Sequence, residues 1–220
     1  MIFIGKIISV SASIILITQW RKLNRVLKSV HMQYCTSIKS VIPNSLIWAL
    51  ICGEDRRHFS HRGVDLIAIV RAIWKFLVYQ KREGGSTIEQ QLIRTVTGCY
   101  QLRLSRKIKE ILLATLIQNV IPKEDIAGVY LSIAYFGWRM NGVLQACRRL
   151  EFDMQFLTYK QASSIIARLK YPEPQKTSPL RQRQIYIRNE YIFRMMKKYK
   201  KVTIPELTND AILNEPLSNF

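Results

Sequence analysis

The chain has 220 residues and a formal net charge of +19, with 34 Lys and Arg against 15 Asp and Glu. This length fits one domain with a short appendage, and no second catalytic domain is expected. The apolar content of 48% excludes a disordered chain and favours a globular core. The charge indicates an anionic partner: a nucleic acid, an anionic membrane surface or a phosphorylated substrate.

Residues 1–20 are expected to form a membrane anchor. Residues 2–20 are almost all apolar or small, interrupted by Lys6, and match the ~20 residues that a membrane-spanning helix needs. A basic start and an apolar centre are also typical of a signal peptide, but residues 19–22 offer no small-residue cleavage site. An uncleaved anchor is therefore favoured over a cleaved signal or a buried helix. The basic residues after the span would by the positive-inside rule hold the C-terminal end of the anchor in the cytoplasm. This conflicts with a domain outside the membrane, so the charge pattern leaves the orientation open.

Beyond the anchor, residues 21–42 are expected to be a basic linker, residues 43–200 one domain and residues 201–220 a loosely held tail. Strand-like alternation is scarce, whereas apolar residues recur at helical spacing, so the domain is predicted to be mainly α. Ser86 and Glu89 are read as a capping box at one helix start. The predicted helices cover residues 45–52, 64–79, 86–95, 105–120, 122–135, 158–169 and 181–198.

The helix predicted at residues 64–79 is rich in apolar side chains. A core helix is the preferred interpretation. The alternative is a membrane-contacting surface formed by Trp74, Phe76, Leu77 and Val78 beside Lys75 and Lys81.

The cysteines do not predict a metal site. They are widely spaced, and no CxxC pair or matching His spacing accompanies them. Two disulfides in an oxidising compartment and four free thiols both stay open, and small buried apolar residues are the favoured interpretation for Cys35, Cys52, Cys99 and Cys147.

Three short polar blocks carry the candidate chemistry: residues 54–63 (EDRRHFSHRG), residues 84–92 (GGSTIEQQL) and residues 106–110 (RKIKE). Each has a structural explanation by itself, namely ion pairs in a loop, a helix cap and a charged helix face. Their order and spacing favour a site. A fourth block, residues 123–137 (KEDIAGVYLSIAYFG), follows them.

In this order the four blocks resemble the glycosyltransferase domain of class A penicillin-binding proteins and its monofunctional relatives, glycosyltransferase family 51. The resemblance covers about residues 43–196, so residues 43–200 are assigned as the glycosyltransferase domain. It implies a mainly α fold, with a lysozyme-like helical lobe facing a smaller membrane-proximal lobe. It also implies a single-pass protein of the bacterial cytoplasmic (inner) membrane with its catalytic domain on the outer face.

The resemblance implies a monofunctional peptidoglycan glycosyltransferase that polymerises lipid II into glycan strands by inverting transfer, with release of undecaprenyl pyrophosphate. The acceptor hydroxyl must lose a proton, which requires a carboxylate base, and Glu54 matches the family's position. Glu110 matches a second family carboxylate, which would orient the donor, hold the basic cluster or help bind a cation. A departing pyrophosphate needs cations and hydrogen-bond donors, and the matching residues are Arg71, Ser86, Gln90, Gln91, Arg94, Arg106, Lys107 and Lys109.

No cofactor is required by this interpretation, and no metal-ligating residue is assigned. A divalent cation, Mg²⁺ or Mn²⁺, at the pyrophosphate is left open. The expected partners are lipid II, the growing glycan strand, the cytoplasmic membrane and other cell-wall synthesis proteins. No nucleic acid is expected, because no dedicated motif or aromatic platform is present. Asp55, His61 and Gly63 are expected to shape the loop that presents Glu54.

Five positions depart from the family pattern and leave full activity open. Histidine replaces Phe in the first block, threonine replaces Asn after the basic residue of the second, and leucine stands where a phosphate-facing Arg is common. In the fourth block, glycine replaces a frequent carboxylate and serine replaces Asn. These residues are His58, Thr95, Leu102, Gly128 and Ser132.

Two other functions compete with this one. A lytic transglycosylase or lysozyme-like hydrolase also uses a Glu in a helical fold, but it would cleave glycan. The cations beside the second carboxylate and the expected anchor argue against it. An inactive membrane-binding or nucleic-acid-binding relative is the other alternative, which the net charge permits.

Overall fold

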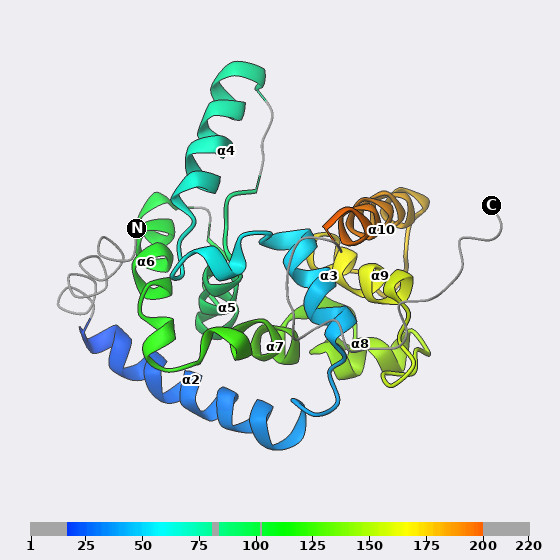
Figure 1. Cartoon of the computed structure of the whole chain (residues 1–220), viewed down its shortest axis with the longest axis horizontal. Helices are drawn as coiled ribbons and strands as arrows, with labels where there is room; N and C mark the ends of the chain where they lie inside the picture. Colours follow the sequence, from blue (N-terminus) through cyan, green and yellow to red (C-terminus); the bar gives the residue numbers. More distant parts are fainter. Residues whose placement is uncertain (1–16, 81–83, 102, 200–220) are drawn as a thin grey trace.

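The computed structural model describes residues 17–80, 84–101 and 103–199. Helices make up most of this part of the chain (Figure 1), and the sheet found in it has two antiparallel strands. The prediction of a mainly α fold is confirmed. The elements are α2 (Ile17–Ser37), α3 (Asn44–Glu54), η1 (His58–Ser60), α4 (Leu66–Tyr79), α5 (Ile88–Thr97), α6 (Leu104–Ala114), η2 (Ile117–Asn119), α7 (Lys123–Ile133), β1 (Tyr135–Gly137), β2 (Met140–Asn141), α8 (Val143–Arg149), α9 (Tyr159–Lys170) and α10 (Pro179–Tyr199).

Helix α3 lies at the centre of the core. It packs against α7, α9 and α10, and Leu46, Ala49 and Leu50 on it are completely buried. Near its end, a Cβ at Gly53 would lie 3.2 Å from the side chain of Ile192 on α10. The missing side chain therefore lets the last turn of α3 approach α10, which places Glu54 beside that helix.

Helix α2 occupies most of the segment expected to be a basic linker. It packs against α5 and α7, and its apolar side chains Leu23, Leu27 and Tyr34 belong to the core. The segment is therefore helical and part of the packed domain, with its basic side chains on the exposed face. Among the described helices, none is long and apolar enough to cross a membrane. Residues 1–16 of the expected anchor and the expected tail at 201–220 lie outside the described residues.

Helix α4 is not the core helix that its apolar content favoured. It projects from the body of the molecule (Figure 1), and Ala68 is its buried residue. Val70, Trp74 and Leu77 are 66%, 62% and 71% exposed. The helical spacing indicated the helix correctly, but the preference for a core helix is wrong, because the described part of the chain leaves these side chains exposed.

The start of α5 differs from the predicted capping box. Thr87, not Ser86, is the N-cap, and its hydroxyl accepts from the amide of Gln90 at 3.3 Å. Glu89 does not reach back to the cap because its carboxylate pairs with Lys123. The cap is thus made one residue later, and Ser86 is left to face the neighbouring helix.

All four cysteines are free thiols. Cys52 and Cys147 are buried, as the favoured interpretation expected, and burial raises the pKa of Cys52 to about 12 and that of Cys147 to about 11. Cys35 and Cys99 are exposed. The interpretation as buried apolar residues therefore holds for two of the four.

Candidate active site

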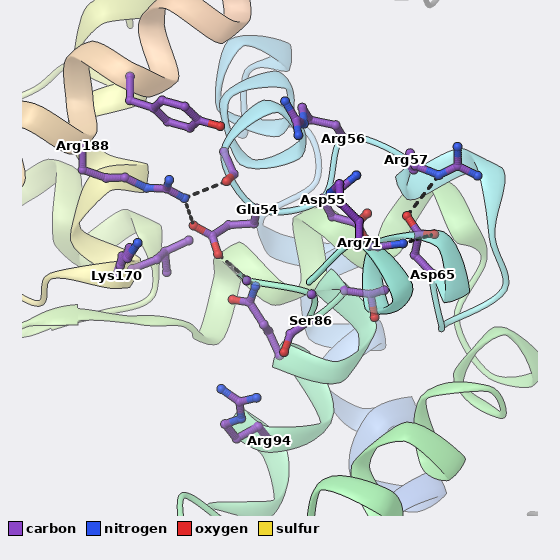
Figure 2. Close-up of a pocket in the computed structure, with 18 residues that line it drawn as sticks. Glu54, Asp55, Arg56, Arg57, Asp65, Arg71, Ser86, Arg94, Lys170 and Arg188 are labelled. Atoms are coloured by element: carbon purple, nitrogen blue, oxygen red, sulfur yellow. Dashed lines mark hydrogen bonds and ion pairs between the residues drawn. The ribbon is translucent and has the colours of Figure 1, made fainter. Parts of the chain in front are cut away.

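A cavity of about 430 Å³ lies where the ends of α3 and α9 meet α4, α5 and α10 (Figure 2). Its basic lining residues outnumber its acidic ones. The basic residues are Arg56, Arg57, Arg71, Arg94, Lys170 and Arg188, and the acidic residues are Glu54, Asp55 and Asp65. Since a cavity lined mainly by one sign of charge concentrates ligands of the opposite sign, this cavity suits an anionic ligand.

Glu54 ends α3 at the wall of this cavity, and hydrogen bonds hold both of its carboxylate oxygens. Gln91 Nε2 donates to Oε2 at 3.0 Å, and Arg188 Nη2 donates to Oε1 at 2.8 Å. Tyr130 donates its hydroxyl to Gln91 Oε1 at 2.8 Å, which turns the amide nitrogen of Gln91 toward Glu54. The carboxylate is therefore fixed in place by side chains from α5, α7 and α10.

Glu110, on α6, is almost completely buried and accepts from three cationic side chains. Arg94 binds it with two parallel hydrogen bonds of 3.0 and 2.9 Å, Lys107 Nζ lies 2.9 Å from Oε1, and Arg106 pairs with Oε2. Burial raises the pKa of Glu110, but the bonds from Arg94 and Lys107 outweigh it and hold that pKa below its ordinary value. Glu110 is thus the anion that gathers the basic cluster.

A divalent cation does not fit at Glu110. Both of its oxygens already accept from Arg94, Arg106 or Lys107, and a metal ion would have to displace these positive charges. Of the roles left open for this carboxylate, holding the basic cluster together is the one that the geometry favours.

Lys107 connects this cluster to the rim of the cavity. Its amine donates to Ser86 Oγ at 2.8 Å and to Gln90 Oε1 at 2.6 Å. Burial lowers the pKa of Lys107, against the opposing effect of Glu110. Ser86 and Gln90 of the second sequence block and Arg106, Lys107 and Glu110 of the third therefore form one hydrogen-bonded network.

Helix α5 joins the two carboxylates. Gln91 contacts Glu54, and Arg94, three residues later and hence on the same face of the helix, binds Glu110 and lines the cavity. Arg71 lines the cavity from α4. Lys109 is exposed and lies instead along a second cavity of about 370 Å³ between α2, α5 and α6, which Arg94, Arg106 and Glu110 also line. Most of the predicted set thus lines one or the other of two neighbouring cavities, whereas Gln90 and Lys107 line neither and connect to the set through hydrogen bonds.

Sequence reasoning missed Arg188, Lys170 and Tyr130. Arg188 contacts Glu54 across 134 positions of sequence, and it is one of several arginines on α10. Lys170 is the last residue of α9 and lines the cavity. No local signal separates these residues from other surface cations, because their role comes from the packing of α9 and α10 on α3.

The loop after Glu54 is anchored to the start of α5. Asp55 accepts from the backbone amide of Ile88 at 3.2 Å and from His61 Nε2 at 3.0 Å. Gly63 has φ +80°, and a Cβ there would lie 2.0 Å from the carbonyl oxygen of Ala114, so only glycine fits without a shift of the backbone. These contacts agree with the predicted loop-shaping role of Asp55, His61 and Gly63.

Three of the unusual positions have local structural explanations. At Gly128 on α7, a Cβ would lie 2.2 Å from the hydroxyl of Tyr34, so the glycine makes room for that ring against α2. Thr95 and Ser132 donate their hydroxyls to backbone carbonyls of their own helices, at 2.9 and 2.7 Å. Leu102 lies outside the described residues.

Comparison with known proteins identifies the family. The profile of the family described as Transglycosylase matches residues 21–197. Penicillin-binding protein 1A of Rickettsia felis is 38% identical over 136 residues, which are 60% of this chain and 17% of that protein. Penicillin-binding protein 1A of Vibrio cholerae is 33% identical over 178 residues, which are 80% of this chain and 21% of that protein. The Escherichia coli protein of this name is 40% identical over 103 residues, which are 46% of this chain and 12% of that protein.

The chain therefore spans about a fifth or less of the length of these relatives. The match of the family profile covers most of the chain and all four sequence blocks. The chain belongs to the transglycosylase family, which confirms the resemblance to glycosyltransferase family 51 and the prediction of an enzyme of the peptidoglycan glycosyltransferase class.

Proposed function

We propose that this domain polymerises lipid II into glycan strands by inverting transfer. The observation that carries the proposal is Glu54, a carboxylate fixed by Gln91 and Arg188 at the wall of a cavity whose lining is mainly cationic. One carboxylate supplies the base, and the surrounding cations accept the charge of the departing pyrophosphate. The family membership supports the same reaction.

In the proposed reaction, Glu54 takes the proton of the acceptor's 4-hydroxyl as its oxygen attacks the anomeric carbon of the growing strand. A carboxylate oxygen has two lone-pair sites, so each oxygen of Glu54 keeps one site beside the bond it accepts from Gln91 or Arg188. The new carbon–oxygen bond forms as the bond to pyrophosphate breaks on the opposite face. Undecaprenyl pyrophosphate leaves with the electron pair, and basic side chains such as Arg94 stabilise it.

The test is Glu54→Gln in the full chain, assayed for glycan synthesis on lipid II. The amide keeps the size of the carboxylate but cannot accept the proton, so the rate is expected to fall about a hundred- to ten-thousandfold. Glu124→Gln is the matched control, since Glu124 is an exposed carboxylate on α7, and its rate is expected to match the parent. Near-normal synthesis by Glu54→Gln would assign the base to another group.

Two further outcomes would replace the proposal. Cleavage of finished peptidoglycan without any change in lipid II would make the protein a hydrolase. A parent protein that binds lipid II but turns over neither substrate would make it an inactive relative, and the substitutions at Thr95 and Ser132 would then be the first to revert toward Asn.

We also propose that the domain works at the outer face of the cytoplasmic membrane. The exposed apolar side chains of α4 (Trp74, Phe76, Leu77, Val78) support contact with the bilayer, and the net charge of +19 supports attraction to anionic lipid. Membrane contact beside the cavity suits a substrate that carries its own lipid. The single-pass anchor at residues 1–20 and the monofunctional character stay predictions.

A further inference from the structure

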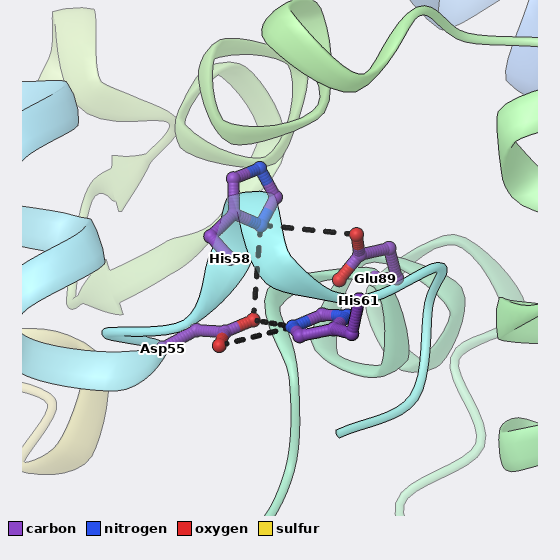
Figure 3. Close-up of side chains that lie close together, drawn as sticks. All are labelled: Asp55, His58, His61 and Glu89. Atoms are coloured by element: carbon purple, nitrogen blue, oxygen red, sulfur yellow. Dashed lines mark hydrogen bonds and ion pairs between the residues drawn. The ribbon is translucent and has the colours of Figure 1, made fainter. Parts of the chain in front are cut away.

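Four side chains of types that can bind a metal ion lie close together (Figure 3): Asp55, His58, His61 and Glu89. They come from the segment after α3 and from the first turn of α5. All four are buried, with side chains at most 4% exposed, and one ligand atom from each lies within 4.8 Å of the other three. The proposed transfer reaction uses none of them directly.

The spacing of these atoms fits a tetrahedral metal ion. His58 Nδ1 lies 3.7 Å from Asp55 Oδ2, and His61 Nε2 lies 3.0 Å from the same oxygen. One carboxylate oxygen of Glu89 lies within 4.8 Å of a ligand atom of each of the other three residues. Zinc bonds to nitrogen and carboxylate oxygen are about 2.0–2.2 Å, which puts neighbouring ligands of a tetrahedron roughly 3.3–3.5 Å apart. The separations of 3.7 and 3.0 Å lie on either side of that value, and the four ligand atoms, all within 4.8 Å of one another, are close enough for local side-chain movement to bring them onto one ion.

Two of the buried ligand groups have unsatisfied atoms aimed into the cluster. Within the described part of the chain, His58 Nδ1 and Glu89 Oε2 have no hydrogen-bond partner. A buried polar atom without a partner costs about 1–3 kcal/mol. The side chain of His58 is completely buried, and its Nδ1 faces the carboxylates of Asp55 and Glu89 at 3.7 Å, beyond hydrogen-bond distance, an arrangement that a bound cation would satisfy.

Lys123 is the competing cation, since its amine pairs with Glu89 Oε1. It does not close the site, because Glu89 Oε2 is free of hydrogen bonds to the described residues and can bind a metal while Oε1 keeps the lysine. The other group of this kind, His31, Cys35 and Asp125, is less suited. It is partly exposed, and Lys39 already pairs with Asp125 at 2.6 Å.

We propose that Asp55, His58, His61 and Glu89 bind one structural Zn²⁺. Two imidazoles and two carboxylates form a ligand set that zinc accepts, and four protein ligands leave no open position for water or substrate, as in structural zinc sites. The ion joins the loop after α3 to the start of α5. Because Asp55 follows Glu54 directly and Gln91 extends from α5 to Glu54, zinc stabilises the placement of the base.

The test measures zinc binding by the metal-stripped full chain, by competition with a chromophoric chelator and by the shift of Tm on addition of ZnCl₂. The parent is expected to bind one Zn²⁺ and to gain Tm, because an ion that binds only the folded state stabilises it. His58→Phe keeps a ring of similar size but removes one ligand, and its affinity is expected to fall at least about tenfold. His31→Gln is the matched control, since the chain has 3 His, and it is expected to bind as the parent does.

Three results would overturn the proposal: no zinc bound by the parent, equal zinc affinity in the parent and His58→Phe, or loss of zinc in His31→Gln. If His58→Phe fails to fold, Co²⁺ added to the parent decides instead, since a tetrahedral site gives intense visible absorption and an octahedral one gives weak absorption. These readouts do not depend on lipid II. The zinc proposal can therefore be disproved while the proposed transfer reaction stands, and the transfer reaction can be disproved while the zinc proposal stands.

Discussion

Arg188 is the side chain on which the position of Glu54 most directly depends. Its Nη2 donates to Glu54 Oε1 at 2.8 Å and to the carbonyl of Gly53 at 2.6 Å. A hydrogen bond to a charged group is worth about 1.5–3 kcal/mol, so Arg188→Ala is expected to lower kcat about ten- to a hundredfold. Arg188→Lys, which keeps the charge without the planar fork, should recover part of the loss.

Steady-state kinetics on lipid II check this prediction, with kcat and KM measured separately. A positioning role lowers kcat more than it raises KM. A rise in KM alone would instead make Arg188 a substrate-binding residue, and unchanged kinetics would show that Gln91 positions Glu54 by itself.

Glu110 is expected to contribute stability that depends on pH. Its pKa is lowered in the folded protein from the ordinary value of 4.5, so its contribution is complete above that value and is lost as the pH falls through the lower, folded-state pKa. At pH 7, Glu110→Gln leaves Arg94, Arg106 and Lys107 without their anion and is expected to cost about 1–3 kcal/mol. The difference between parent and variant should narrow in acid.

Urea unfolding at pH 7 and near pH 3.5 measures that difference, with Glu124→Gln as the exposed control. A stability gap that stays constant or widens in acid would mean that the contribution of Glu110 does not come from its charge.

At the scale of elements, the contact between α2 and α7 depends on a glycine. A helical Gly→Ala change usually stabilises by about 0.5–1 kcal/mol, but at Gly128 the added Cβ would lie 2.2 Å from the hydroxyl of Tyr34. Gly128→Ala is therefore expected to destabilise by about 1–3 kcal/mol through overpacking. In a Tyr34→Ala background the same change should be neutral or stabilising.

A double-mutant cycle of unfolding free energies checks the pair. Additive effects of the two substitutions would show that α2 moves away from α7 at little cost. In that case, packing against Tyr34 would not explain why Gly128 is a glycine.

Periodicity predicted most of the helices correctly, because the spacing of apolar residues is a local property. The starts of α3 after Pro43, of α7 after Pro122 and of α9 at Thr158 agree with the sequence signals. The cap of α5 was predicted one residue too early because Glu89 prefers Lys123, a partner 34 positions away. The segment of α2 was missed as a domain helix because its basic residues hid a narrow apolar face, which includes Leu23 and Leu27.

For the molecule as a whole, α4 is expected to contribute to membrane association. Trp74 and Leu77 are exposed, so the double change Trp74→Ser with Leu77→Ser should leave Tm nearly unchanged. It should lower binding to anionic lipid vesicles by about tenfold or more, because each apolar side chain buried in the bilayer contributes about 1.5–3 kcal/mol. The effect should be clearest in a chain that lacks residues 1–16. Truncation at residue 20 would remove Trp20, which packs against the core.

Vesicle co-sedimentation checks this prediction. The exposed pair Leu180→Ser with Ile187→Ser on α10 is the matched control and is expected to bind vesicles as the parent does. Equal binding by the α4 variant and this control would show that charge or the N-terminal segment holds the protein at the bilayer.

The sequence by itself determined the family, the mainly helical fold and Glu54 as the candidate base, because motif order and apolar spacing are written along the chain. Only the tertiary structure decided that Arg188, 134 positions away, holds Glu54 and that Glu110 is enclosed by three cations. It also decided that α4 stands exposed and that Asp55, His58, His61 and Glu89 lie close together. These features depend on which helices pack together, and that packing is set by the burial of distant side chains such as Ile192 against Gly53, which no local pattern records.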